Sequence, residues 1–155
     1  MATLQIIIVG VAATLVMTLF MNACAAITRS NMYTVKILSL MLPTLFRPAT
    51  AGESRSSKAA ATVLHYGIGI LFVFFYHLLR TSHGYAGNQS MAEPWIIGIT
   101  LGIIAVGGWT FFIRMHPAPL ATVPWPYYLV CIFAAHIVFA FAMIYCYKWV
   151  AFLLR

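Results

Sequence analysis

The stretch MATLQIIIVGVAATLVMTLFMNACAAIT, residues 1–28, contains no Asp, Glu, Lys or Arg. Three more uncharged windows follow it, at residues 59–79, 94–113 and 115–147. About 20 helical residues cross a hydrocarbon core about 30 Å thick, and lipid cannot satisfy an open strand backbone. The sequence therefore predicts an all-α integral membrane protein, a bundle of four transmembrane helices at about residues 4–27, 59–79, 94–113 and 127–149.

The composition supports a chain that lies almost wholly in the bilayer. Of the 155 residues, 63% are hydrophobic and only 7% are charged, whereas soluble proteins average about 25% charged residues. Four spans and one modest connecting segment use the whole length, so residues 1–155 are expected to form a single transmembrane domain. No nucleophile elbow, P-loop, HExxH or dinucleotide-binding turn is present, and we do not expect the chain to be catalytic on its own.

The net charge of +7 is best explained by membrane topology. Basic residues gather in short loops rather than on a solvated face, so nucleic acid is not an expected partner. The loops after the first and third helices share one side and hold six of the nine basic residues. The positive-inside rule then places both termini outside, which is the periplasmic side of a bacterial inner membrane.

A short amphipathic segment is expected on the inner side, at about residues 31–46, and its helix should end near Pro43. Apolar and polar residues separate on its helical wheel, with Val35, Leu38 and Leu42 on one side and Thr34, Lys36 and Ser39 elsewhere. This separation is typical of an interfacial helix that lies along the lipid headgroups.

The chain also contains an apparent internal repeat. The first and third windows share one pattern: Gly10, Ala13, Thr18 and Phe20 match Gly102, Ala105, Thr110 and Phe112. The second and fourth share another: His65 and Tyr76 match His136 and Tyr147 at the same eleven-residue separation. Two duplicated helical hairpins would be related by an axis along the membrane normal. The alternative is coincidence among common residues, but the paired His and Tyr favour duplication.

Small and polar residues recur every four positions along the first helix: Gly10, Thr14, Thr18, Asn22 and Ala26. Small residues allow close helix contact, and Thr or Asn side chains form hydrogen bonds across it, so the stripe favours helix packing. The alternative is the hydrophilic lining of a transport path, with Thr14, Thr18 and Asn22 as its polar groups.

The third helix carries a GxxxG motif formed by Gly98 and Gly102. This motif marks a close contact with another helix. The partner helix could belong to the same chain or to another subunit.

His65 and His136 are the candidate cofactor-binding residues, because an ionisable side chain within a bilayer is a functional hypothesis by default. Facing imidazoles could ligate the iron of haem b or another metal, or bind a quinone, with Tyr76 and Tyr147 as aromatic neighbours. The expected helix starts give the histidines a depth mismatch of roughly 6 Å at 1.5 Å per residue. That mismatch favours the alternative, in which each neutral imidazole bonds a Thr, Asn or Tyr.

The remaining ionisable groups near the span ends are given simpler roles. His77 and His116 are expected to be solvated, since no acid cluster accompanies them. Glu93 precedes Pro94 and is expected to mark a helix start.

Three functions are compatible with this sequence. The leading hypothesis is a non-enzymatic subunit or accessory protein of a larger membrane complex, because loops and acids are few and packing motifs are present. The first alternative is an electron-transfer subunit that binds haem b or quinone through His65 and His136. The second is a transporter or channel for a small solute or a metal, built by self-association around the polar stripe.

The basic inner loop yields a prediction about bound phospholipid. Lys36, Arg47, Arg55 and Lys58 should face anionic headgroups, at about 1 kcal/mol for each basic residue near the surface. Replacing both Arg55 and Lys58 with Gln should lower the amount of anionic lipid retained in native mass spectrometry. Unchanged retention would leave topology as the only role of these charges.

Overall fold

The computed structural model describes residues 2–43, 54–82, 91–116 and 120–153. These residues form five helices and no strand: α1 (Ala2–Thr28), α2 (Thr34–Met41), α3 (Arg55–Ser82), α4 (Glu93–Met115) and α5 (Trp125–Leu153). All except α2 are long and apolar enough to cross a membrane. The predicted all-helical fold, with four helices long and apolar enough to cross a membrane, is confirmed.

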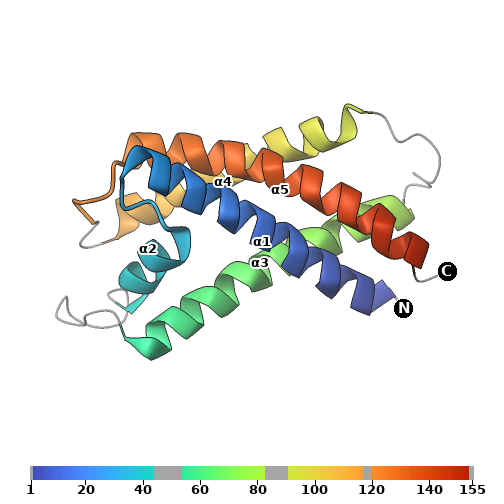
Figure 1. Ribbon diagram of the computed structural model, residues 1–155, viewed down its shortest axis with the longest axis horizontal. Helices are drawn as coiled ribbons and strands as arrows, with labels where there is room; N and C mark the ends of the chain where they lie inside the picture. Colours follow the sequence, from blue (N-terminus) through green and yellow to red (C-terminus); the bar gives the residue numbers. More distant parts are fainter. Residues whose placement is uncertain (1, 44–53, 83–90, 117–119, 154–155) are drawn as a thin grey trace.

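The four long helices form an antiparallel bundle with α1 and α5 at its centre. α5 packs between α4 and α1, α3 packs against α1, and α2 packs against α3, whereas α3 and α4 do not form a packed pair. The start of α1 and the end of α5 lie at the same end of the bundle (Figure 1). We call this the terminal end, and we call the opposite end, where α2 lies, the α2 end.

α3 begins earlier than the uncharged window suggested, because its first turn is capped by serine. The N–H of Ser57 donates to Ser54 Oγ at 3.0 Å, and the N–H of Ser54 donates to Ser57 Oγ at 3.0 Å. This reciprocal pair satisfies two of the donors that a helix N-terminus leaves unpaired. The helix therefore starts at Arg55 rather than near residue 59.

α1 and α3 cross in close contact, because both helices present glycine at the crossing. A Cβ atom added to Gly10 would lie 2.7 Å from Ile70 Cα, and one added to Gly69 would collide with Thr14 Oγ1. From this point toward the α2 end, α3 runs away from α1, and α2 lies in the space between them (Figure 1). The crossing thus opens a wedge on one side of the bundle.

The GxxxG motif makes its contact within the chain, against α5. A Cβ atom on Gly98 would lie 2.7 Å from Ile137 Cα, and one on Gly102 would lie 2.7 Å from the Phe133 ring. Of the two partners considered from the sequence, the described residues show the intrachain one.

The proposed repeat does not extend to equivalent helix contacts. Gly10 and Gly102 are matched positions, but Gly10 meets Ile70, which follows His65, whereas Gly102 meets Phe133, which precedes His136. The two hairpins therefore pack in different registers. Duplication of the hairpin stays a prediction.

α2 packs against the bundle with a face that differs from the predicted one. Thr34 and Ser39, which the helical wheel separates from the apolar residues Val35, Leu38 and Leu42, are buried together with Ile37 and Met41. Ser39 can be buried because its hydroxyl donates to the Lys36 carbonyl at 2.8 Å. The position of α2 in the headgroup layer stays a prediction.

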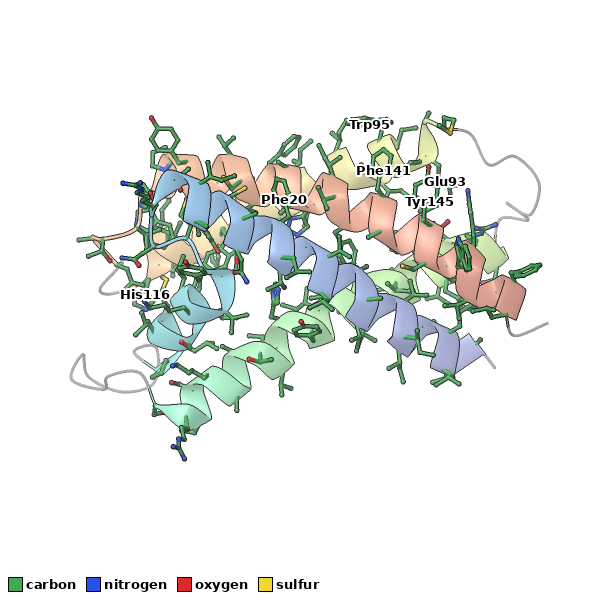
Figure 2. All side chains as sticks on the ribbon, in the orientation of Figure 1. Phe20, Glu93, Trp95, His116, Phe141 and Tyr145 are labelled. Carbon is green, nitrogen blue, oxygen red and sulfur yellow. The ribbon has the colours of Figure 1, made fainter. Side chains whose placement is uncertain are left out.

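His116 attaches the end of α4 to α2, and its predicted solvation is wrong. The side chain is 5% exposed, and its Nε2 lies 3.1 Å from the Met41 carbonyl oxygen, which can only accept a hydrogen bond. Figure 2 shows His116 beside α2. The contact depends on the return of α4 to the α2 end, which no local sequence pattern reveals.

The α1–α3 crossing should be sensitive to a single methyl group. Gly10→Ala should lower the unfolding temperature in detergent, because overpacking typically costs about 1–3 kcal/mol and the obstructing atom is backbone. Gly107→Ala is the matched control, since no atom lies within 4 Å of its added Cβ. That variant should be as stable as the wild type or slightly more stable, because Ala is the better helix former. Equal stability of the two variants would contradict a tight crossing.

Candidate functional site

A cavity of about 320 Å³ lies in the wedge, and all five helices contribute to its lining. The lining is mainly apolar, and it contains no Asp, Glu, Lys or Arg. Apart from the indole of Trp109, its nitrogen- and oxygen-bearing side chains are Thr18, Thr34, His65 and His136. An apolar cavity with a few polar groups is the usual form of a small-molecule site.

His136 lines this cavity, and a backbone hydrogen bond defines the tautomer of its ring. Its Nδ1 lies 2.8 Å from the carbonyl oxygen of Ile132, one helical turn earlier. A carbonyl only accepts, so Nδ1 carries the proton and Nε2 of the neutral ring carries a lone pair. Phe72 packs against the imidazole edge to face, with ring centroids 6.4 Å apart, and helps to hold its orientation.

His65 is oriented by a chain of hydroxyl groups on α1. The Thr14 hydroxyl donates to the Gly10 carbonyl at 2.7 Å, and the Thr18 hydroxyl donates to the Thr14 carbonyl at 2.8 Å. The single proton of Thr18 is thereby used, so its oxygen accepts from His65 Nε2–H at 3.1 Å. The lone pair of His65 therefore lies on Nδ1.

The structure brings the two predicted histidines to one cavity, and the expected depth mismatch is wrong. Because α3 begins at Arg55, His65 lies as far along α3 as His136 lies along α5, to within one residue. The expected hydrogen bond to a threonine is present for His65, whereas His136 uses a backbone carbonyl instead. Both side chains line the cavity, and neither unprotonated ring nitrogen is among the fully enclosed side-chain atoms that lack a partner.

The predicted polar stripe on α1 divides among different environments. Thr14 is buried at the α1–α3 crossing, and Thr18 reaches the cavity. Asn22 is half-buried and lies outside the cavity lining. The stripe therefore packs α1 against α3 and holds one of the two histidines. It does not form a continuous polar path through the described residues.

Tyr76 and Tyr147 lie outside the cavity, in a separate polar cluster toward the terminal end. The Tyr76 hydroxyl donates to Glu93 Oε1 at 3.0 Å and accepts from Arg80 Nη1 at 3.2 Å. The Tyr147 hydroxyl is hydrogen-bonded to His77 Nδ1, and the two tyrosine rings pack edge to face at 5.4 Å. We call these residues the terminal cluster; Figure 2 labels Glu93 within it.

Glu93 and His77 were not recognised as members of such a cluster from the sequence. Glu93 is more than a helix start, and His77 is half-buried rather than solvated. The sequence contains one indication of such a cluster: ionisable residues stand at the ends of two successive uncharged windows, and these two ends are expected on the same side of the membrane. Their partners depend on how α3 meets α4 and α5.

The basic residues assigned to lipid headgroups lie toward the α2 end. Lys36, Arg55 and Lys58 are exposed, and Arg47 lies outside the described residues. No group of three or more His, Cys, Asp or Glu that could hold a metal occurs among the residues that the structure describes.

Comparisons with protein-family models, curated proteins and solved structures gave no match to this chain. Its function is therefore argued from the geometry and chemistry of the site.

The terminal cluster should contribute to stability through one hydroxyl group. Tyr76→Phe removes the donor to Glu93 and the acceptor for Arg80 while the aromatic ring remains. We expect the free energy of unfolding in detergent to fall by about 1–3 kcal/mol, as for hydrogen bonds to charged groups. Tyr145→Phe is the control, because that ring is exposed and its hydroxyl makes no hydrogen bond to the part of the chain that the structure describes. An equal effect of both substitutions would contradict a stabilising cluster.

Proposed function

We propose that the protein binds a quinol in the cavity and serves as a membrane subunit of a larger electron-transfer complex. The observation that carries this proposal is the pair of imidazoles that line one uncharged cavity, each with one ring nitrogen hydrogen-bonded to the protein and the other left to carry a lone pair. His65 and His136 are the residues that would contact the ligand.

The tautomers of the two histidines favour the reduced form of the ligand. A quinol hydroxyl donates a hydrogen bond to an imidazole lone pair, whereas a quinone carbonyl only accepts. Oxidation of a quinol to a quinone releases two protons and two electrons. His65 Nδ1 and His136 Nε2 carry the lone pairs that would accept the protons. The electrons would pass to a redox group of a partner subunit, which is why we propose a complex.

The surroundings of the cavity suit a ligand that arrives from the bilayer. α3 and α4 both line the cavity but do not form a packed pair, so we propose that the ligand enters between them. Leu64 and Ile68 on the α3 side are exposed, and no atom lies within 4 Å of a Cβ added to Gly108 on the α4 side. An isoprenoid or alkyl tail could therefore remain in lipid while the ring enters.

The two other candidate functions fit the site less well. Haem b carries two carboxylates, and the lining offers no Lys or Arg to pair with them. The cavity volume is also near the lower end of the usual range of about 300–1,000 Å³. A solute channel would need a continuous polar path, and of the α1 stripe only Thr18 lines the cavity.

We further propose a bacterial inner membrane as the location, with the α2 end cytoplasmic and both termini periplasmic. The excess of basic residues in the loops at the α2 end supports this orientation. In this orientation the exposed side chains of Lys36, Arg55 and Lys58 would meet anionic headgroups. α2 would then lie at the inner membrane surface, with its buried face on α3.

Quinol binding should depend on both histidines. The purified protein in lipid nanodiscs would be titrated anaerobically with a decyl-substituted benzoquinol, and binding would be followed by tryptophan fluorescence, because Trp109 lines the cavity. His65→Leu and His136→Leu should each weaken affinity about tenfold, the value of one hydrogen bond. His77→Gln is the control outside the cavity and should leave the affinity unchanged.

Two results would oppose this function. One is an affinity for quinol that is the same in both histidine variants as in the wild type. The other is tighter binding of the corresponding quinone, which would contradict the assigned tautomers. A Soret band that disappears in the His65 and His136 variants would instead establish the haem alternative.

A further inference from the structure

The two histidines of the cavity are held by different kinds of group. His136 Nδ1 bonds the carbonyl oxygen of Ile132 on its own helix, a backbone group that no substitution removes. His65 Nε2 instead bonds the hydroxyl of Thr18, which belongs to α1 and lies across the wedge from α3. The residues that the structure describes make no second hydrogen bond to the His65 ring. The protonation pattern of His65 therefore depends on one replaceable side chain.

The number of hydrogen bonds decides which nitrogen of His65 carries the proton. When the Thr18 hydroxyl donates to the Thr14 carbonyl at 2.8 Å, its oxygen accepts from His65 Nε2–H, and two bonds form. When the hydroxyl turns to donate to an unprotonated Nε2, the bond to Thr14 is lost and one bond remains. One additional hydrogen bond favours the first arrangement about fivefold.

We propose that Thr18 is a positioning residue that makes the site select the reduced form of the ligand over the oxidised form. It acts through His65, because holding the proton on Nε2 leaves the lone pair on Nδ1. That lone pair accepts from a quinol hydroxyl and has no proton to donate to a quinone carbonyl. This inference rests on the proposed function, in which His65 and His136 contact the ligand.

Removal of the Thr18 hydroxyl should release His65 to take the other tautomer. A proton kept on Nε2 would then have no acceptor in a mainly apolar setting, which costs free energy. With the proton on Nδ1, His65 would donate to a quinone carbonyl, while His136 would still carry its lone pair on Nε2. The site would offer one donor and one acceptor, and its preference for quinol would decrease.

The first measurement is the tautomer of His65 in the ligand-free protein. Histidine labelled with ¹⁵N would be observed by NMR in nanodiscs, because the protonated and unprotonated nitrogens of a neutral imidazole have well-separated chemical shifts. The signals of His65 would be assigned by their loss in His65→Leu. We expect Nε2 to be protonated in the wild type and Nδ1 to gain the proton in Thr18→Val. Thr18→Ser, which keeps the hydroxyl, should retain the wild-type tautomer.

The second measurement is the ratio of the Kd for a decyl-substituted benzoquinone to the Kd for the corresponding benzoquinol, titrated in nanodiscs as above. Thr18→Val replaces the hydroxyl with a methyl group of similar size and should lower this ratio about fivefold. Thr18→Ser should keep the wild-type ratio. Thr100→Val is the matched control, because its exposed hydroxyl also bonds the carbonyl one turn earlier, that of Ile96, outside the cavity.

The failure of this inference can be distinguished from the failure of the proposed function. If quinol binding depends on the histidines but Thr18→Val keeps the wild-type ratio or the wild-type tautomer, the role of Thr18 is overturned alone. Equal losses of affinity for quinol and quinone in Thr18→Val would also overturn it, because a merely structural role weakens both. If the wild type binds neither ligand, the proposed function fails and this inference fails with it.

Discussion

The close crossing of α1 and α3 is the contact on which the rest of the structure depends. Gly10 and Gly69 allow the two backbones to approach, and Thr14 fills the remaining space. Because the pair is held together at this point, α3 diverges from α1 toward the α2 end, where α2 and the cavity occupy the wedge. The hydroxyl chain that orients His65 also starts here, at the Gly10 carbonyl. The residues that form the crossing thus also begin the chain of hydrogen bonds that orients His65.

The bundle separates its buried polar groups into two regions with different properties. In the terminal cluster, Tyr76 and Tyr147 hydrogen-bond to charged or polar partners from neighbouring helices, which stabilises the bundle. Of the histidines that line the cavity, each uses one ring nitrogen in a hydrogen bond to the protein and leaves the other without one. Incomplete hydrogen bonding in an apolar environment costs stability, so its concentration in one cavity supports a binding role there.

Much of the architecture could be predicted from the sequence, and some of the candidate site could as well. The spans follow from four uncharged windows, since the need to satisfy every backbone group in lipid leaves few alternatives. His65 and His136 stood out because ionisable residues are scarce in such windows. The depth mismatch failed because a serine cap, and not the last charge, sets the start of α3. His77 and His116 were misjudged because their partners come from other helices.

The sequence by itself determined that the chain has four helices long and apolar enough to cross a membrane, which glycines permit close helix contact, and which histidines lie within those helices. These properties depend on local composition and spacing. Only the tertiary structure decided that Gly98 and Gly102 meet α5, that Thr18 holds His65, and that both imidazoles share one cavity. It also decided that Thr34 and Tyr128 are buried. The physical reason is that hydrogen bonding and burial between helices depend on crossing points and rotations, which hydrophobic periodicity does not encode.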